Sequence, residues 1–387
     1  GFSQAEPQEA FASLYSLKQR QPNWRSVTVK TFPNGTPESI LLYEPIFGGE
    51  ERIAKQVLFY ENGRLRTEMD VAIVDEDSPG ASVWNSSIVP HGTRVDLSEE
   101  GQVQHTSEYR FGLIHGMDRM FYPNGKVSIT SQYVNGILDG LTQSYFENEQ
   151  LKEEVHYQNG QLEGDFLKYY ENGTKALQHH FENGKLHGTS FEWYPSGVLK
   201  LQREFRMGQL QGAGKNPALI AYDEQRNVIE MLDFKEGIPV GIHLRYHSNG
   251  RESYRVTYKN GKKDGKEQFF DVEGNLIGRG QYADGHPVGK HWKNHPDGKP
   301  AYIAEFDDNG ELLEPVCEYY ADGKRSREYS MQEGKLEGTY LEWYPDGALK
   351  YEYSYGPEGL DGEQRDYYPN GQLKICTHYQ NQKRFGL

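Results

Sequence analysis

Five of the thirteen histidines fall in one stretch of the chain and are its first candidates for chemistry. His243 and His247 come first, and His286, His291 and His295 follow. Imidazole groups held close together could ligate a transition metal. In an extended strand, however, His291 and His295 lie about 13 Å apart, which is too far for both to bind one metal ion. The sequence therefore predicts no metal ion and no bound cofactor.

No pairing of a nucleophile with a base stands out elsewhere. The sequence contains no Gly-x-Ser-x-Gly and no His-Glu-x-x-His motif, which are local signatures of serine hydrolases and zinc proteases. Neighbouring acids such as Glu153-Glu154 and Asp307-Asp308 fall where strands or turns are expected, and we interpret them as solvated charge. We therefore expect a protein that is not an enzyme.

A repeat of 24 residues must position all of these side chains. Self-similarity at a fixed period is the signature of a repeat architecture. One glycine opens each unit, and two further glycine columns keep step with it. The opening glycines are Gly116, Gly140, Gly164, Gly188, Gly212, Gly241, Gly265, Gly289, Gly338 and Gly362. A five-residue insertion follows Gly212, and Glu314 takes the opening position of one unit.

Each unit has the pattern of a β-hairpin. About six residues after the opening glycine end in an aromatic pair, such as Phe121-Tyr122, and a turn such as Pro123-Asn124-Gly125 follows. A second run then reaches another aromatic residue eight positions after the turn glycine, for example Tyr133. Short aromatic runs bounded by Asn-Gly turns indicate strands and not helices.

Aromatic residues form two columns along the first strand of the units. The fifth position is aromatic in nine of ten units, and we interpret it as the buried spine. The sixth position faces the other way because side chains alternate along a strand, and tyrosine is favoured at interfaces. These tyrosines are our candidate partner-binding residues, and stacking between hairpins is the alternative interpretation. They are Tyr122, Tyr170, Tyr194, Tyr320, Tyr344 and Tyr368.

The sixth-position tyrosine is lost in a group of neighbouring units. His247, Asp271 and His295 stand in its place. Together with Glu267 and His291 they form an atypical patch. The sequence leaves two interpretations open, a specialised binding patch or ordinary sequence drift.

Composition narrows the class of partner. The chain has 387 residues, with 43 glycines and 28 tyrosines, and 42 Lys and Arg stand against 57 Asp and Glu. This acidic balance disfavours nucleic acid, whose phosphates it repels. No run approaches the roughly 20 apolar residues of a membrane helix, so membrane insertion is not expected.

The order of opening glycine, aromatic pair, Asn-Gly, leucine and second aromatic resembles the MORN repeat, in particular its bacterial variant. The resemblance covers about residues 101–386. It implies an all-β fold, in which tandem 24-residue hairpins build an elongated single-layer antiparallel sheet, a MORN-like solenoid. Relatives of this kind serve as scaffolds or binding surfaces, and many carry the label of antitoxin in a toxin–antitoxin pair.

Upstream the pattern weakens, and three regions are predicted. Residues 1–30 form an N-terminal cap segment, residues 31–100 are degenerate repeats, and residues 101–387 are the repeat array. An irregular insertion, about Val74 to Glu99, interrupts the second region. Within residues 6–20 the apolar side chains recur at helical spacing, so a short helix could cap the sheet or bind a partner.

The leading hypothesis is a non-enzymatic repeat scaffold that binds a protein partner along an aromatic-rich β-surface. Neutralisation of a toxin, as the family label suggests, and glycan binding by stacked tyrosines are the alternatives. The chain begins with Gly-Phe and not with Met. This favours a bacterial protein exported to the periplasm or cell surface, with its signal peptide removed, over a cytoplasmic one.

Overall fold

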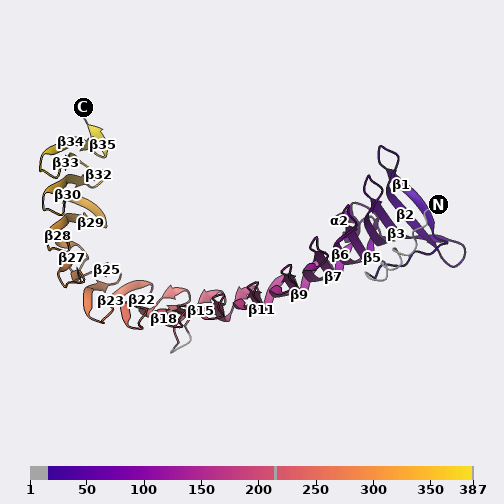
Figure 1. Ribbon diagram of the computed structural model, residues 1–387, viewed down its shortest axis with the longest axis horizontal. Helices are drawn as coiled ribbons and strands as arrows, with labels where there is room; N and C mark the ends of the chain where they lie inside the picture. The colour runs from indigo at the N-terminus through magenta and orange to yellow at the C-terminus, as the bar shows by residue number, and fades with distance from the viewer. Residues whose placement is uncertain (1–15, 213–215, 386–387) are drawn as a thin grey trace. The chain divides into compact units, whose positions relative to one another are not determined.

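The computed structural model describes residues 16–212 and 216–385 (Figure 1). Nearly all of the regular structure is antiparallel β-sheet, with 33 strands in one sheet and β19 (Phe234–Lys235) paired with β20 (Ile238–Pro239) in another. This open antiparallel sheet confirms the predicted all-β hairpin fold. The chain divides into two units, residues 1–197 and 198–387, which we describe in turn.

The first unit contains fourteen strands and the helix α2 (Pro79–Trp84) in its described part. The strands are β1 (Arg25–Thr31), β2 (Pro37–Pro45), β3 (Glu51–Phe59), β4 (Leu65–Ile73), β5 (Ile88–Leu97), β6 (Val103–Arg110), β7 (Leu113–Phe121), β8 (Val127–Val134), β9 (Ile137–Tyr145), β10 (Leu151–Gln158), β11 (Gln161–Tyr169), β12 (Lys175–Glu182), β13 (Lys185–Leu186) and β14 (Gly188–Trp193).

The second unit continues the same pattern of strands. These are β15 (Leu199–Arg206), β16 (Gln209–Leu210), β17 (Leu219–Tyr222), β18 (Val228–Leu232), β19, β20, β21 (Gly241–Tyr246), β22 (Glu252–Lys259), β23 (Lys262–Phe270), β24 (Leu276–Ala283), β25 (His286–Pro287), β26 (Gly289–Asn294), β27 (Pro300–Phe306), β28 (Leu312–Tyr319), β29 (Arg325–Gln332), β30 (Lys335–Trp343), β31 (Leu349–Gly356), β32 (Gly359–Leu360), β33 (Gly362–Tyr367), β34 (Leu373–Gln380) and β35 (Lys383–Phe385).

Two kinds of turn alternate along the array. Between β8 and β9, Asn135 and Gly136 both have positive φ, 50° and 83°, as a two-residue type I′ turn requires. Between β7 and β8 the loop is longer: the Gly125 N–H donates to the Tyr122 carbonyl, and only the glycine has positive φ. That geometry fits a three-residue loop in which glycine forms the bulge.

The type I′ turns also join each hairpin to the preceding one. The N–H of Gly136 donates to the carbonyl of Ile114 at 2.8 Å, and that of Gly160 donates to Leu138 at the same distance. In the second unit Gly261 donates to Pro239 and Gly285 to Lys263. Backbone groups at the turns are thus satisfied between neighbouring hairpins.

Five of the ten opening glycines lie inside strands, four begin a strand, and Gly212 lies outside the strands. Strand β9 begins at Ile137, three residues before Gly140, because the type I′ turn precedes it. Gly140 has φ of 116°, and a Cβ there would collide with the Gln132 side chain. Every opening glycine in the described residues except Gly212 has positive φ. The column therefore marks a backbone conformation that favours glycine, although Glu314 takes the position in one unit.

The buried columns differ from the predicted spine. The fifth-position aromatics are only half-buried, so their assignment as the spine was wrong. The buried side chains of several units lie instead at the second position of the first strand and at the middle of the second strand. These include Val155, Val256, Ala304 and Val316, between 0 and 4% exposed. Rings also occupy equivalent positions in other units, for example His291 at the second position of the first strand and Tyr329 in the middle of the second strand, so burial there does not depend on side-chain size.

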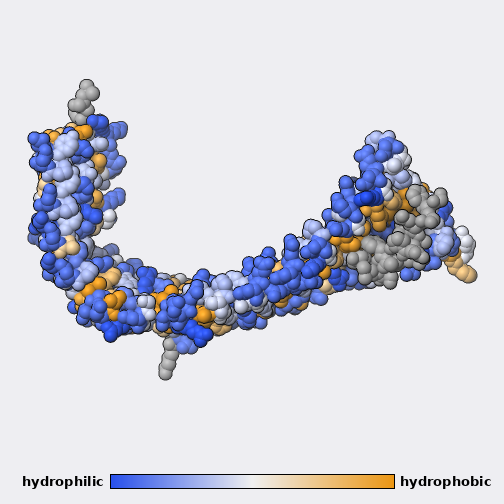
Figure 2. Space-filling view, viewed as in Figure 1, coloured by the Kyte–Doolittle hydropathy of each residue, from blue (hydrophilic) through white to orange (hydrophobic). Residues whose placement is uncertain are grey.

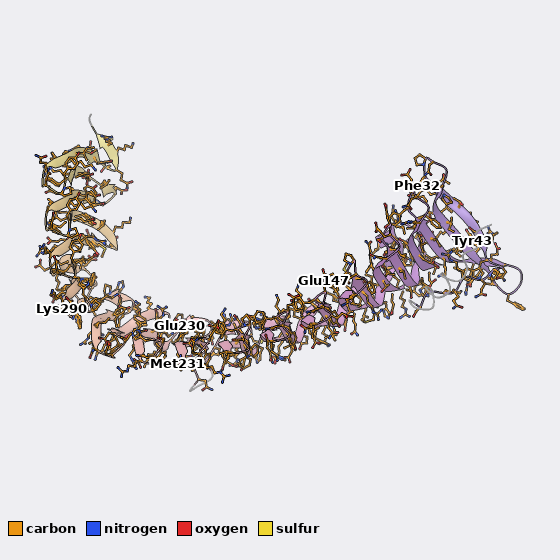
Figure 3. The ribbon with its side chains drawn as sticks, viewed as in Figure 1. Phe32, Tyr43, Glu147, Glu230, Met231 and Lys290 are labelled. Atoms are coloured by element: carbon orange, nitrogen blue, oxygen red, sulfur yellow. The ribbon has the colours of Figure 1, made fainter. Side chains whose placement is uncertain are left out.

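The N-terminal strands carry a larger core. Val57, Val89 and Val95 are fully buried in β3 and β5, and Figure 2 shows hydrophobic side chains gathered there among hydrophilic ones. Figure 3 shows side chains projecting from both faces of the strands. In the described part of the first unit, buried apolar side chains are therefore concentrated in the N-terminal strands and are fewer in the hairpins that follow.

Part of the predicted N-terminal helix, residues 1–15, lies outside the described residues, and residues 16–20 are not helical. Within the predicted insertion, residues 74–99, the structure places α2 and the regular strand β5. Ser78 caps α2 by accepting a hydrogen bond from the Ala81 N–H. The Trp84 indole N–H donates to the Gly112 carbonyl at 2.8 Å and fixes α2 on the turn that follows β6.

Candidate binding surfaces

The sixth-position tyrosines connect each hairpin to the next. Four of their hydroxyls donate to a backbone carbonyl of the following unit. The pairs are Tyr122 to Tyr145 (2.6 Å), Tyr170 to Trp193 (2.7 Å), Tyr320 to Trp343 (2.7 Å) and Tyr344 to Tyr367 (3.0 Å). Tyr194 is half-buried, and Tyr368 is 47% exposed. Most of these hydroxyls are therefore engaged inside the array.

The histidines that replace tyrosine in this column make the same contact. The Nε2 of His247 lies 2.9 Å from the Phe270 carbonyl, and that of His295 lies 2.8 Å from the Tyr319 carbonyl. Asp271 instead stabilises its own turn, accepting the Asn275 N–H at 2.7 Å. These three residues of the predicted patch are spread along the turns and form no common site.

Glu267 and His291, the other two residues of the patch, share one hollow. Both are buried, at 8% and 7% exposure. The hollow has a volume of about 350 Å³, and its lining includes Phe269, Tyr282 and Lys293. The structure thus brings together two of the five predicted residues.

Glu267 is held as a carboxylate in this hollow. It accepts hydrogen bonds from the Tyr254 hydroxyl and the Lys263 ammonium, both at 2.6 Å. Burial raises the pKa of Glu267, but the hydrogen bonds from Lys263 and Tyr254 outweigh it, and the pKa is below its usual value. Burial lowers the pKa of Lys263, but the hydrogen bond and the charge of Glu267 raise it by more, so the pKa is above its usual value.

Two glycines in β24 create the space that Glu267 and His291 share. A Cβ on Gly280 would stand 2.6 Å from the His291 Nδ1, and one on Gly278 would stand 2.9 Å from the Lys293 side chain. The sequence signal was present as Gly278-Arg279-Gly280. Sequence reasoning missed it because the pairing of β24 with β23 and β26 decides which side chains lean over the glycines.

A second hollow on the same face, of about 330 Å³, is lined by residues that include Phe234, His243, Tyr254, Tyr258 and Lys263. We call this face of β21–β27 the ring face. It offers aromatic side chains with amines close to them: the Lys293 Nζ lies 3.8 Å from the Phe269 ring centroid, and the Lys263 Nζ lies 4.8 Å from that of Tyr282. Such a surface can bind apolar and polar groups together.

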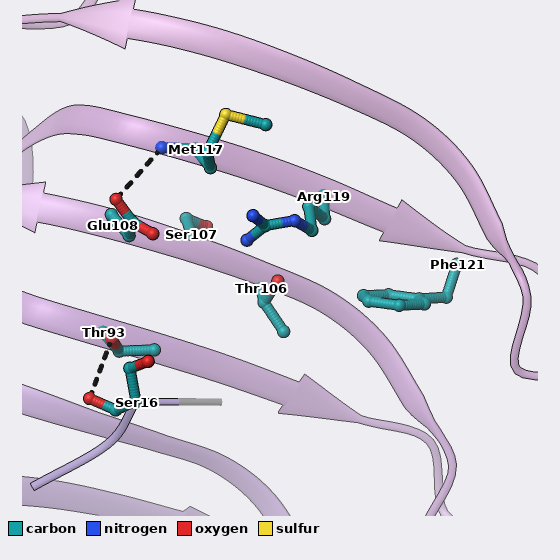
Figure 4. A pocket seen from close by; sticks show the side chains of 8 residues that line it. All are labelled: Ser16, Thr93, Thr106, Ser107, Glu108, Met117, Arg119 and Phe121. Atoms are coloured by element: carbon teal, nitrogen blue, oxygen red, sulfur yellow. Dashed lines mark hydrogen bonds between the residues drawn. The ribbon is translucent and has the colours of Figure 1, made fainter. Parts of the chain in front are cut away.

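In the first unit, a hollow of about 370 Å³ opens beside β6 and β7 (Figure 4). Its lining includes Ser107 and Arg119, and Glu108 there accepts the Met117 N–H. Behind Ser107 lies His105, whose Nε2 is 3.2 Å from the serine Oγ and 2.6 Å from the Asp118 Oδ1. Its Nδ1 lies 3.4 Å from Asp96.

This serine, histidine and aspartate resemble a nucleophile with its base, but the charges oppose that role. Hydrogen bonds to Asp118 and Asp96 outweigh burial and raise the pKa of His105 to about 9. Burial raises the pKa of Asp96, but hydrogen bonds from His105 and Arg94 lower it to about 2. A protonated imidazole cannot take a proton from Ser107, so the cluster is a charge pair that ties three strands.

Among residues 16–212 and 216–385, no group of three or more His, Cys, Asp or Glu side chains is arranged to hold a metal ion. Within those same ranges no helix has the length and apolarity to cross a membrane.

The hairpins described above are similar to a known family of repeats. The model of the MORN repeat variant matches residues 115–135, 138–159, 162–184, 186–206, 336–355 and 360–381. The chain carries MORN repeats. Three of these matches lie in the first unit, the fourth runs from the first unit into the second, and two lie in the second. The unmatched stretch between residues 206 and 336 contains the insertion and the histidine-rich hairpins.

No curated protein matches the chain. Among solved structures, a TcdB2-TccC3 structure is 11% identical over 88% of the chain, at a TM-score of 0.16. A Photorhabdus luminescens Tc holotoxin pore is 10% identical over 90%, at 0.15. The MORN-repeat chain spans 23% and 22% of the length of those chains. At these TM-scores the overlap assigns neither a fold nor a partner.

Proposed function

We propose that this MORN-repeat protein is a non-enzymatic scaffold that binds a protein partner along the faces of its sheet. One observation carries the proposal: the contacts that hold the hairpins together recur in most units, whereas the face positions vary. The turn amides and sixth-position donors bond to neighbouring units. The faces are left to differ from unit to unit.

The ring face supports the proposal further. Its two hollows combine aromatic rings with Lys263 and Lys293, and aromatic side chains supply much of the binding energy at protein interfaces. Neutralisation of a toxin is a narrower form of the same proposal, with the toxin as partner. Glycan binding would use the same rings, because sugars also stack on them, and it stays an alternative prediction.

Site-specific crosslinking tests the proposal. A photoreactive amino acid replaces Tyr302 on the ring face or Gln281 on the opposite face, and Asn148 in an exposed turn is the matched control. Exposed to a lysate of the source cells, the face variants should crosslink one protein that the turn variant does not. That protein, purified, should bind the unmodified chain and compete with crosslinking.

Crosslinks to many unrelated proteins, or the same products from all three variants, would contradict a specific protein scaffold. Binding to defined sugars on a glycan array, together with the absence of any specific protein product, would favour the glycan alternative instead.

A further inference from the structure

The face opposite the ring face carries three exposed cations on neighbouring strands: Lys266 on β23, Arg279 on β24 and Lys290 on β26. Lys290 is labelled in Figure 3. No ion pair joins any of the three to a carboxylate within the described ranges, whereas Lys262 pairs with Asp284 and Lys299 with Asp297. We call Lys266, Arg279 and Lys290 the basic patch.

The pairing of the strands places the three cations within reach of one small ligand. Lys266 is opposite Gln281, and Arg279 is opposite Trp292. Strands lie about 4.8 Å apart, so Lys266 and Lys290, two strands apart, are separated by roughly 10 Å at the backbone. Arg279 lies on the strand between them. It is two residues along the strand from Gln281, so the backbones of these two residues are about 7 Å apart.

The other charges on this face leave the patch positive. Glu305, which is exposed, lies opposite Lys290 on β27 without an ion pair to it. Arg255, opposite Gln268 on the next strand, is paired with Glu252. Glu314, also exposed, lies opposite Glu305 on β28. The three cations of the patch therefore outnumber these two exposed carboxylates.

This positive charge is a local departure from the rest of the chain. Residues 241–306 contain eleven Lys and Arg against eight Asp and Glu, whereas the whole chain has 42 against 57. At the positions equivalent to the basic patch, some other units carry acids. These are Glu154, Asp165, Glu328, Glu352 and Glu363.

We propose that the basic patch binds a short acidic peptide segment of the partner. An arginine fork and two lysines pair with carboxylates, the Gln281 amide can bond the peptide backbone, and Trp292 offers an apolar surface beside Arg279. Carboxylates on every second or third residue of an extended peptide match spacings of about 7 and 10 Å. This inference rests on the proposed function in one respect, which is that the ligand is a segment of a protein.

A short segment fits better than a long polyanion. Beyond the patch several of the equivalent positions are acidic, none outside residues 241–306 is basic, and the chain has a formal charge of −15. A nucleic acid or a long sulfated glycan would extend past the patch onto the negatively charged surface around it and be repelled. A segment of a few residues gains the three cations without that penalty.

Fluorescence anisotropy of a labelled ten-residue peptide of alternating Glu and Ser tests the proposal on the full chain. We expect a dissociation constant of about 0.1–1 mM at 50 mM salt, since exposed ion pairs are weak, and weaker binding at 300 mM salt. The double variant Lys266→Glu, Lys290→Glu should bind at least fivefold more weakly. The control Lys335→Glu, Lys383→Glu changes the net charge equally on exposed lysines elsewhere and should bind within twofold of the unmodified chain.

Equal losses in both double variants, or none in either, would overturn the proposal, as would patch-dependent binding of a heparin decasaccharide without binding of the peptide. Circular dichroism of each variant establishes that it is folded. If the crosslinking experiment finds a partner but the peptide does not bind, only this inference fails. If the peptide binds through the patch and no partner is found, the proposed scaffold function fails and the patch stands.

Discussion

At the sixth position of the first strand, tyrosine in some units and histidine in others donate a hydrogen bond to the equivalent backbone carbonyl of the next hairpin. Tyr320 reaches Trp343 at 2.7 Å, and His295 reaches Tyr319 at 2.8 Å. Both side chains carry a ring with a donor at its far end. The histidines at this position therefore preserve the contact between neighbouring hairpins.

Removing one hydroxyl should show what this contact contributes. Tyr320→Phe leaves the ring in place but deprives the Trp343 carbonyl of its donor, and should lower the free energy of unfolding by about 1 kcal/mol. Tyr368→Phe is the control, because the Tyr368 hydroxyl makes no hydrogen bond in the described part of the chain and is 47% exposed. Its effect should stay within about 0.5 kcal/mol. Urea unfolding of both variants measures the difference, and equal effects would argue against the role of the hydroxyl.

His105 predicts a pH dependence of stability. Its pKa of about 9 in the folded protein lies above the ordinary histidine value of 6.5, so its stabilising contribution is complete below about pH 6.5 and is lost as the pH rises through 9. His105→Gln should therefore lower stability by about 1–2 kcal/mol at pH 6, after allowance for solvent screening, and by much less at pH 10. Thermal unfolding at both pH values checks this, and a loss independent of pH would contradict the charge pair.

At the scale of elements, the turns show how local chemistry sets the hairpins. Most type I′ turns pair asparagine or aspartate with glycine, but Met207, Glu236 and Glu333 occupy the first position with φ between 49 and 53°. Residues of these types rarely adopt positive φ, whereas asparagine does so at lower cost. The fold tolerates the strain because the following glycine and the neighbouring hairpin fix the turn.

Exchanging residues at this position should change stability in opposite directions. Glu333→Asn should raise the free energy of unfolding by about 0.5–1 kcal/mol, and Asn260→Glu in an equivalent turn should lower it by a similar amount. Differential scanning calorimetry of the two variants gives the signs. Shifts in the same direction would mean that side-chain contacts and not φ determine the turn.

The same local chemistry explains what could be predicted from the sequence. The 24-residue period, the Asn-Gly turns and the aromatic alternation each depend on neighbours in sequence, and they indicated the correct fold. The buried columns were misassigned because ring type signals apolar surface but not how far neighbouring strands cover it: the fifth-position rings stay half-buried, whereas Val155 and Val256 are buried. The meeting of Glu267 with His291 depends on pairing across β24, which no local pattern reveals.

At the scale of the whole molecule, each hairpin contacts mainly its neighbours in sequence. The sixth-position bonds span 23 residues at Tyr122 and 24 at His295. Longer connections occur near the N-terminus, where the Lys18 N–H reaches Asp70 across 52 residues. Stability in such arrays is close to a sum of unit and neighbour terms.

Deletion of whole units should therefore be tolerated when the phase is kept. Removing residues 164–187 joins Glu163 to Gly188, one opening glycine replacing another, and should leave a folded protein with a thermal midpoint only slightly reduced. Removing residues 164–175 joins Glu163 to Ala176, breaks every column at that point and should expose local structure to protease. Limited proteolysis and circular dichroism compare the two, and equal damage would refute independence of the units.

The short span of these hydrogen bonds has a consequence for synthesis. A nascent chain leaves the ribosome at about 5–20 residues per second, so the carbonyl that Tyr122 needs, 23 residues later, emerges within a few seconds. Each hairpin of the array can close onto the one already made without waiting for distant sequence, as proteins of low contact order do. At any moment during translation, the unpaired edge offered to other nascent chains is therefore that of a single hairpin.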